Sequence, residues 1–441
     1  MSEDDLSVFD IKYNEAMKRL NSLYLPKEEE SNSESTKLDN KSLFSNENIN
    51  MGRQSELDYL KTLGIFLMVV SHVYDNYSVG YFEKIIYFLS FILGAGGFML
   101  LMGIGMKYSR HHDTKNYIAR GLGLLTIGQY VNLLRDTLPN FIAWKITKNK
   151  IFLSRALLVL QADILTFAGF AFLLLAVFKK LKFSDTYILI ISIIMNVGAY
   201  PLYKKMKSPD NFLLSQILGY FVLTNAEAYF PLFSYFIFVA FGYWLGGIFQ
   251  KISNKDKFYN LVLIICFSIV TIYYYYRSHY DFPLLPKYFS DEHYCLSPGP
   301  DAIMSCLTNL TALAIFHKID NLLKGKTPEL ITHAATNLNQ YYIISYLFIT
   351  PMNTFLIATK GENYPKQTKY PTGMAIMVII FCRVLIDIND KYINFTITTL
   401  KNPMRNVIFS LIWIITIISV IYIYPKLDVY ATLWNNYLKT N

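Results

Sequence analysis

The sequence predicts an all-α polytopic membrane protein, a bundle of about 10–11 transmembrane helices. The first supporting observation is composition: 53% of the 441 residues are hydrophobic, and the mean hydropathy is positive, at +0.28. The second is the number of long apolar runs, because a hydrocarbon core of roughly 30 Å requires about 20 apolar residues per span. A soluble domain of this length would rarely contain so many.

Apolar segments separated by short polar loops account for this bundle. In chain order they cover residues 57–77, 84–106, 117–138, 153–178, 185–203, 229–250, 258–276, 301–318, 337–357, 372–388 and 404–424. A further apolar segment, 211–225, is too short to span and predicts a re-entrant or interfacial helix. Pro231 suits the first turn of the helix that follows it.

The two ends of the chain differ from this apolar middle. Residues 1–52 are polar, with runs such as PKEEESNSESTKLDNKS, and predict a disordered cytoplasmic tail without a cleavable signal peptide. Residues 53–424 form the predicted transmembrane domain, and residues 425–441 a C-terminal tail. The basic loops fall on both sides of the membrane in this topology, so the excess of cytoplasmic positive charge is weak.

Charge and motifs exclude several function classes. The net charge of +9 is scattered over short loops and does not gather on one face, which argues against nucleic-acid binding. The four cysteines give no disulfide framework. The chain has no GxxxxGK[ST], HExxH, GxSxG or CxxC motif, and no metal site is expected.

The first span, LDYLKTLGIFLMVVSHVYDNY (57–77), carries ionisable groups inside an apolar helix. Each such group costs roughly 2.5–3.5 kcal/mol near the bilayer centre, so it indicates a functional site. Lys61 and His72 are eleven residues apart, which places them on one helix face about 16 Å apart along the axis. The structural alternative is that Lys61 snorkels to the interface and His72 hydrogen-bonds to another helix.

The stretch LDYLKTLGIFLMVVSH resembles the first helix of the acyltransferase-3 type of integral membrane acyltransferases, whose pattern is LDxLRGxAxxxVxxxH. Lys61 stands where that pattern has arginine, and a lysine meets a phosphate as a point charge and not as a fork. FILGAGGFMLLMGIGMKYSR (91–110) is similar to the second helix of these enzymes and of the related heparan-alpha-glucosaminide N-acetyltransferases. LNQYYIISYLFITP (338–351) looks like a late family helix that often has histidine in place of Ser345. The similarity spans roughly residues 53–424.

The resemblance implies transfer of an acetyl (acyl) group from cytoplasmic acetyl-CoA (acyl-CoA) to a hydroxyl of a carbohydrate or cell-envelope glycan, without a permanently bound cofactor. His72 would act as the general base or carry the acyl group itself. Asp75, at i+3, would orient the imidazole, or else is a solvated interfacial residue. Asp58 would pair with Lys61.

Basic residues near one end of the predicted second and third helices would hold the donor. Lys61 and Arg120 are the predicted contacts to the donor phosphates, with Arg110 and Lys107 beside them. The alternative for the loop residues is ordinary topogenic charge.

The predicted acceptor contacts are Asn225 and Glu227, because they lie at a broken turn at membrane depth. Arg155 and Asp163 share a helix face and would pair with other helices or line the acceptor path. Arg383 and Asp387 predict an i,i+4 ion pair.

Two other function classes remain open at this point. A transporter or flippase would also explain a buried His/Lys pathway and the short segment before Pro231. A non-catalytic membrane sensor would use residues 1–52 as its effector. Only the acyltransferase consumes a thioester. Its expected setting is the plasma membrane with a cytoplasmic N-terminus and lipid contacts, and a homo-oligomer is compatible with the sequence.

Overall fold

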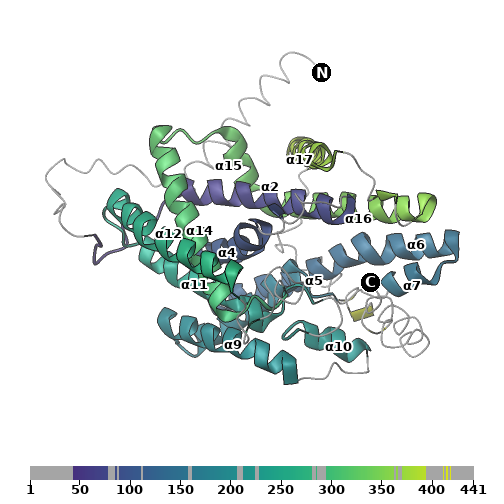
Figure 1. Ribbon diagram of the computed structural model, residues 1–441, viewed down its shortest axis with the longest axis horizontal. Helices are drawn as coiled ribbons and strands as arrows, with labels where there is room; N and C mark the ends of the chain where they lie inside the picture. The colour runs from purple at the N-terminus through teal and green to yellow at the C-terminus, as the bar shows by residue number, and fades with distance from the viewer. Residues whose placement is uncertain are drawn as a thin grey trace, which may run out of the picture. The chain divides into compact units, whose positions relative to one another are not determined.

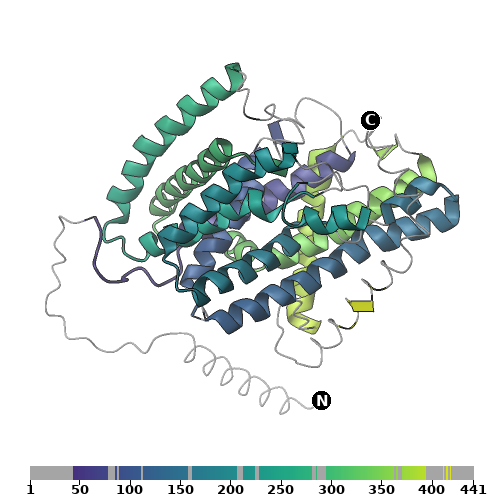
Figure 2. The same cartoon turned by 90° about the horizontal axis from the view of Figure 1, so that it is seen from below.

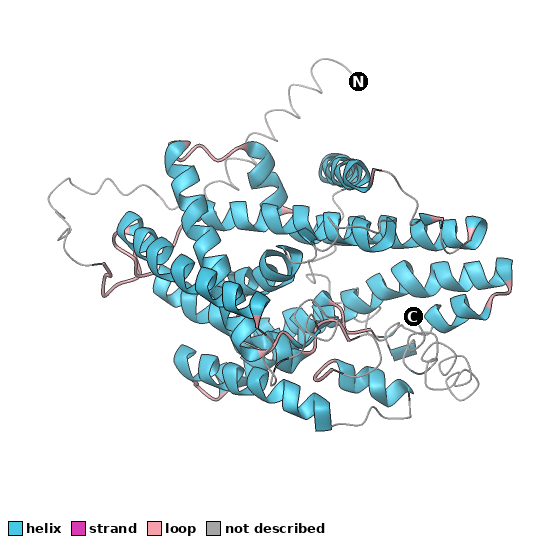
Figure 3. Ribbon diagram, viewed as in Figure 1, coloured by secondary structure: helices cyan, strands magenta, loops and turns pink. Residues whose placement is uncertain are grey.

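The structure of the chain is a computed structural model (Figure 1). It describes residues 43–393 apart from 78–84, 87–88, 111–112, 157–160, 206–211, 224–227, 281–284, 286–294, 362–363 and 366–369, and also positions 411, 414, 415 and 418. Within this part the elements are helices, and no strand is formed (Figure 3). This confirms the predicted all-α class. The predicted span 404–424 and tail 425–441 lie outside the described residues, apart from those four positions.

Seven helical stretches among the described residues are long and apolar enough to cross a membrane. They are α2 (Ser55–Tyr77), α9 (Asp185–Lys205), α11 (Leu232–Phe249), α12 (Lys255–His279), α14 (Gly299–Leu322), α16 (Leu338–Lys360) and a stretch from Pro371 to Tyr392, of which α17 (Pro371–Ile388) is the main part. Each coincides with one predicted span. The chain is therefore a multi-pass integral membrane protein.

Three predicted spans differ in detail from the helices observed. Span 84–106 contains a π-helical turn, η1 (Ser90–Ala95), that leads into α4 (Gly96–Tyr108). Span 117–138 is part of a longer helical run made of α5 (Thr114–Asn132), the π-helical turn η2 (Leu133–Thr137) and α6 (Leu138–Thr147). The prediction of one helix over 153–178 is wrong, because α7 (Lys150–Ala156) ends before α8 (Ile164–Lys180) begins.

The start of α8 has a local cause. Asp163 is extended and caps the helix, its Oδ1 accepting a hydrogen bond from the Ile164 amide at 2.6 Å. Elsewhere the short apolar segment forms α10 (Phe212–Gly219), and Pro231 is the N-cap of α11, one residue before the predicted first turn. A short helix, α15 (Glu329–Thr336), joins α14 to α16.

The core is built on α4 and α11, which approach each other through glycines. A Cβ added at Gly242 would lie 2.0 Å from the carbonyl oxygen of Leu100, and one added at Gly103 would lie 2.1 Å from that of Val239. Small residues allow this close backbone approach between membrane helices. The α5–α8 pair uses Gly121 in the same way, with a carbonyl oxygen 2.9 Å from its added Cβ.

Gly242→Ala is therefore expected to destabilise the protein by about 1–3 kcal/mol, because the obstructing atom is backbone and the two helices must separate. The measurement is thermal unfolding of the purified protein in detergent. Gly105→Ala on α4 is the matched control, since nothing lies within 4 Å of its added Cβ and alanine is the better helix former. Equal losses in the two variants would contradict this account of the interface.

The outer side of the bundle carries large apolar side chains. Helix α12, next to α14 at the edge in Figure 2, exposes Ile264 at 68% and Phe267 at 57%. Such exposure on a helix of this length fits contact with lipid, where apolar side chains need no protein cover.

The N-terminal end of α2 is fixed by polar contacts to the helices around it. Glu56 is buried and binds Lys255 at 3.1 Å and the hydroxyl of Tyr259 at 3.0 Å, while Ser55 donates to Asp320 at 2.6 Å. Residues 43–52, assigned above to the tail, run along the α11–α12 turn, where Ser45 and Ile49 donate backbone hydrogen bonds. This part of the predicted tail is ordered against the bundle; residues 1–42 lie outside the described residues.

Candidate functional site

Helix α2 lines three cavities through the side chains that its sequence singled out. His72 lines a polar cavity of about 380 Å³ near the C-terminal end of the helix. Lys61 lines two further cavities near the N-terminal end. The helix thus connects a cationic end with an imidazole end, as its eleven-residue spacing implies.

The imidazole of His72 is held by α16. The Tyr346 hydroxyl lies 3.2 Å from Nδ1, and the two ring centroids are 4.2 Å apart. The nearest Asp75 carboxylate oxygen is 4.0 Å from Nδ1, which is too far for a hydrogen bond. Among the described residues Nε2 makes no hydrogen bond, and the side chain is 25% exposed. A tyrosine that the sequence analysis did not single out is therefore the hydrogen-bond partner of this histidine.

The polar cavity is lined by amides, hydroxyls and charged groups from several helices. Its residues are Ser71, His72, Asp75, Asn76, Ser90, Arg135, Asp136, Asn140, Arg155, Gln161, Asp163, Tyr229, Phe230, Tyr346, Thr350, Asn353 and Thr354. Such a lining offers many hydrogen-bond donors and acceptors beside apolar and aromatic surface. A polyhydroxylated ligand is the kind of molecule that it would bind.

A buried arginine in the lining of this cavity binds three of its other lining residues. Arg135 lies in the π-helical turn η2, with its side chain 5% exposed. It donates to Asp163 at 2.9 Å, to Gln161 at 2.6 Å and to Asp136 at 2.6 Å. Because all three bonds go to acceptors that are charged or strongly polar, the guanidinium is held rigidly.

The same network reaches His72 through aromatic rings. The Arg135 guanidinium carbon lies 4.6 Å from the centre of the Tyr346 ring, a cation–π contact. One turn earlier on α16, Tyr342 donates to Asp163 at 2.5 Å, and its ring centroid is 4.9 Å from that of Tyr346. Ser345, which stands where the resembling helix often has histidine, is buried and bonds within its own helix.

An apolar cavity of about 280 Å³ adjoins the polar one without sharing a lining residue. Apart from Lys61, Asn339 and Tyr342 it is lined by aliphatic, thioether and phenylalanine side chains of α2, α4, α5, α8 and α16. Lys61 and Leu101 also line a third cavity of about 240 Å³, toward the N-terminal end of α2. The three cavities follow one another along α2.

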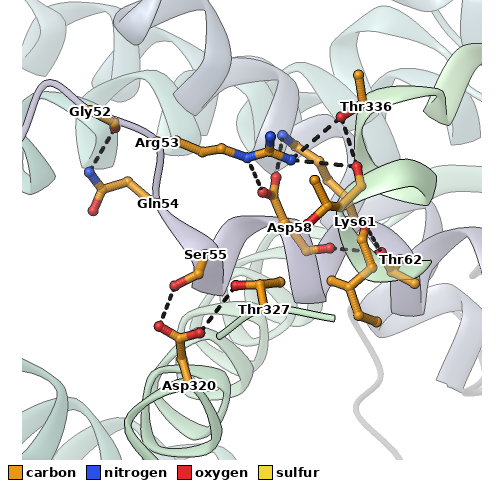
Figure 4. Close-up of polar contacts among 12 residues, drawn as sticks. Gly52, Arg53, Gln54, Ser55, Asp58, Lys61, Thr62, Asp320, Thr327 and Thr336 are labelled. Atoms are coloured by element: carbon orange, nitrogen blue, oxygen red, sulfur yellow. Dashed lines mark hydrogen bonds and ion pairs between the residues drawn. The ribbon is translucent and has the colours of Figure 1, made fainter. Parts of the chain in front are cut away.

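The third cavity is lined by Arg53, a basic residue that the sequence does not mark as a donor contact (Figure 4). Arg53, 56% exposed, binds Asp58 at 2.5 Å, and Lys61 approaches the other oxygen of that carboxylate at 3.4 Å. The predicted Asp58–Lys61 pair is confirmed. Two cations thus share one carboxylate, so the end of the cavity keeps a net positive charge.

The remaining predicted donor contacts lie elsewhere. Lys107 pairs with Asp185 and lies 4.8 Å from the centre of the Tyr243 ring. Arg110 and Arg120 are exposed. None of the three lines any of these cavities.

Two further predictions concern other parts of the chain. Asn225 and Glu227, the predicted acceptor contacts, lie outside the described residues. The predicted Arg383–Asp387 pair is confirmed at 2.9 Å. Among the described residues no three His, Cys, Asp or Glu side chains gather as a metal site would require.

Comparison with known proteins gives one match. Residues 53–273, about half of the chain, match the family described as heparan-alpha-glucosaminide N-acetyltransferase, catalytic. No curated protein and no solved structure matches the chain. The matched region begins at Arg53 and contains α2, the η2 turn and the start of α8, and so most of the residues around the three cavities.

Proposed function

Since the chain belongs to the heparan-alpha-glucosaminide N-acetyltransferase family and is therefore a membrane acetyltransferase, we propose that it moves an acetyl group from cytoplasmic acetyl-CoA to a hydroxyl of a carbohydrate or cell-envelope glycan. The observation that carries this proposal is the series of cavities along α2. A cationic cavity, an apolar cavity and a polar cavity with a histidine succeed one another. In this order they would take the nucleotide phosphates of acetyl-CoA, its pantetheine arm, and the acceptor hydroxyl that meets the thioester.

The donor would enter at Arg53 and Lys61. A guanidinium forms two parallel hydrogen bonds with a phosphate, which a lysine ammonium does not. Arg53, eight residues before Lys61 in the chain, would therefore supply the two parallel hydrogen bonds to phosphate that a lysine cannot form. The apolar cavity beyond Lys61 has space for the pantetheine arm, and the nucleotide would stay at the charged end.

The acceptor would bind in the polar cavity, with its hydroxyl at His72. As a general base, Nε2 would take the hydroxyl proton while the oxygen attacks the thioester carbon; the C–S bond then breaks and the thiol leaves with a proton. As a nucleophile, the same nitrogen would first take the acetyl group from sulfur and then pass it to the hydroxyl oxygen. In both routes Tyr346 orients the ring through Nδ1, and Asp75 contributes charge at the cavity edge.

The basic loops support a cytoplasmic donor end. Two lysine-rich segments, 250–257 at the start of α12 and 317–326 at the end of α14, contact the N-terminal end of α2 through the Lys255–Glu56 and Asp320–Ser55 pairs. Positive charge gathers on the cytoplasmic side of membrane proteins. We therefore assign the Arg53–Lys61 end, and with it the N-terminus, to the cytoplasm, and the polar cavity to the opposite side of the plasma membrane.

The first experiment is calorimetric titration of acetyl-CoA into the purified protein in nanodiscs. Wild type is expected to bind. Arg53→Ala and Lys61→Ala are each expected to weaken binding by roughly 10- to 100-fold, since a hydrogen bond to a charged group contributes about 1.5–3 kcal/mol. Removal of the phosphate contacts should leave binding of acetyl-pantetheine, which has no nucleotide, unchanged between the variants.

Lys180→Ala is the control for charge alone, because Lys180 is exposed at the end of α8 and lines none of the cavities. Arg120→Ala tests the contact predicted from sequence. Wild type that fails to bind acetyl-CoA would overturn the proposed donor. Weakening by Arg120→Ala and not by Arg53→Ala would move the phosphate site to the α5 end.

A further inference from the structure

The apolar and polar cavities are placed back to back by three helices. On α2, Met68 lines the apolar cavity and Ser71, nearly one turn later, lines the polar one. On α16, Tyr342 lines the apolar cavity and Tyr346, one turn later, lines the polar one. At the start of α8, Ile164 faces the apolar side and Asp163 the polar side. These neighbouring residues of the same three helices form the wall between the two spaces.

One hydrogen bond in this wall joins α16 to the start of α8. The Tyr342 hydroxyl donates to Oδ2 of Asp163 at 2.5 Å, and the tyrosine side chain is buried. Asp163 is held independently of this bond, by Arg135 at 2.9 Å and by the Ile164 amide at 2.6 Å. Tyr342 could leave without releasing the carboxylate. Of this hydrogen-bonded pair, the tyrosine is therefore the member that could move without releasing the other.

We propose that Tyr342 is the gate between the donor and acceptor cavities: closed on Asp163 it keeps a thioester in the apolar cavity away from water in the polar cavity, and it swings aside for acetyl transfer. This inference rests on the proposed function. The protected side reaction is hydrolysis, in which water adds to the acyl carbon, the C–S bond breaks and the thiol leaves with a proton from the water. Excluding water from a reactive group is a general task of closed active sites.

The test measures acetate released from radiolabelled acetyl-CoA by the purified protein without any acceptor. Tyr342→Ala opens the wall and is expected to release acetate about tenfold faster than wild type or more. Tyr342→Phe keeps the ring but loses the bond to Asp163, and its rate is expected to fall between the two. Tyr341→Phe is the matched control, since Tyr341 is the adjacent buried tyrosine on α16, contacts His333 and lines neither cavity.

Donor binding by calorimetry separates the outcomes. Wild-type rates of acetate release from variants that bind acetyl-CoA normally would overturn the gate and leave the proposed function intact. If Tyr342→Ala does not fold, Tyr342→Phe is the deciding variant. A rate of acetate release equal to that of wild type would then show that the Tyr342–Asp163 hydrogen bond does not keep water from the thioester. Absence of acetyl-CoA binding by wild type would overturn the proposed function and the gate together.

Discussion

His72→Ala is expected to lower kcat for acetyl transfer by about 10²–10⁴-fold, the range that a positioned general base contributes. The Kd for acetyl-CoA should stay within about twofold of wild type, because His72 lines the polar cavity and not the cavities assigned to the donor. The measurement pairs steady-state rates for a carbohydrate acceptor with calorimetry of the donor. A loss of turnover with intact binding is what a group acting on the reacting atoms produces.

Tyr346→Phe is the companion variant for His72. It removes the hydroxyl from Nδ1 and keeps the ring against Arg135, so a smaller loss of kcat is expected than for His72→Ala. Asp75→Asn should have the smallest effect, since its carboxylate lies 4.0 Å from Nδ1. Full activity of His72→Ala would move the reacting centre away from α2.

Isotope exchange distinguishes the two roles open to His72. If the imidazole carries the acetyl group, wild type will exchange labelled CoA into acetyl-CoA without acceptor, and His72→Ala will not. If it acts only as a base, no exchange is expected without acceptor. The polar cavity allows both, because His72 lines it and its Nε2 makes no hydrogen bond among the described residues.

The features of α2 that the sequence predicts are local. Helical periodicity alone places Lys61 and His72 on one face, pairs Asp58 with Lys61, and marks the helix as functional through the cost of its charges. The same applies to the Arg383–Asp387 pair, four residues apart. Such contacts depend on one helix and so need no knowledge of the fold.

The partners of His72 depend on contacts between distant segments. Tyr346 is 274 positions away in sequence, in a chain rich in tyrosine, so its contact with His72 cannot be read from the sequence. Arg135 and Asp163 are visible as intramembrane charges, but their meeting depends on the break before α8, which composition does not reveal. One signal was available: Tyr342 and Tyr346 are spaced i,i+4 on one helix face.

The sequence context of Arg53 hides its position for a different reason. It stands at the boundary between a polar tail and an apolar helix, where a basic residue reads as ordinary topogenic charge. Its position in the third cavity follows from the packing of residues 43–52 along the α11–α12 turn. Lys107, Arg110 and Arg120 line none of the three cavities along α2, and the donor contacts assigned to them from sequence stay predictions.

Arg135→Met is expected to destabilise the protein by about 3–5 kcal/mol, because it leaves the buried Asp163 carboxylate without its cation. Asp163 is 4% exposed, and the Asp136 carboxylate, at 18%, loses the same partner. The measurement is thermal unfolding in detergent. Adding Asp163→Asn to Arg135→Met should recover part of the loss, since it removes the uncompensated charge while keeping the acceptor for Tyr342.

Arg383→Met provides the matched control for Arg135→Met. Its ion pair with Asp387 has the same 2.9 Å length as that between Arg135 and Asp163, but the two side chains are 27% and 50% exposed. An exposed pair contributes about 1 kcal/mol or less. If both single variants lose equal stability, burial of the Arg135 network is not what holds η2 to α8. If Arg135→Met alone is severely destabilised and Asp163→Asn relieves the loss, the Arg135–Asp163 pair is a buried charge network that stabilises the fold. The desolvation free energy of these charges is then tolerated because Arg135 also holds Tyr346, the hydrogen-bond partner of His72, in place.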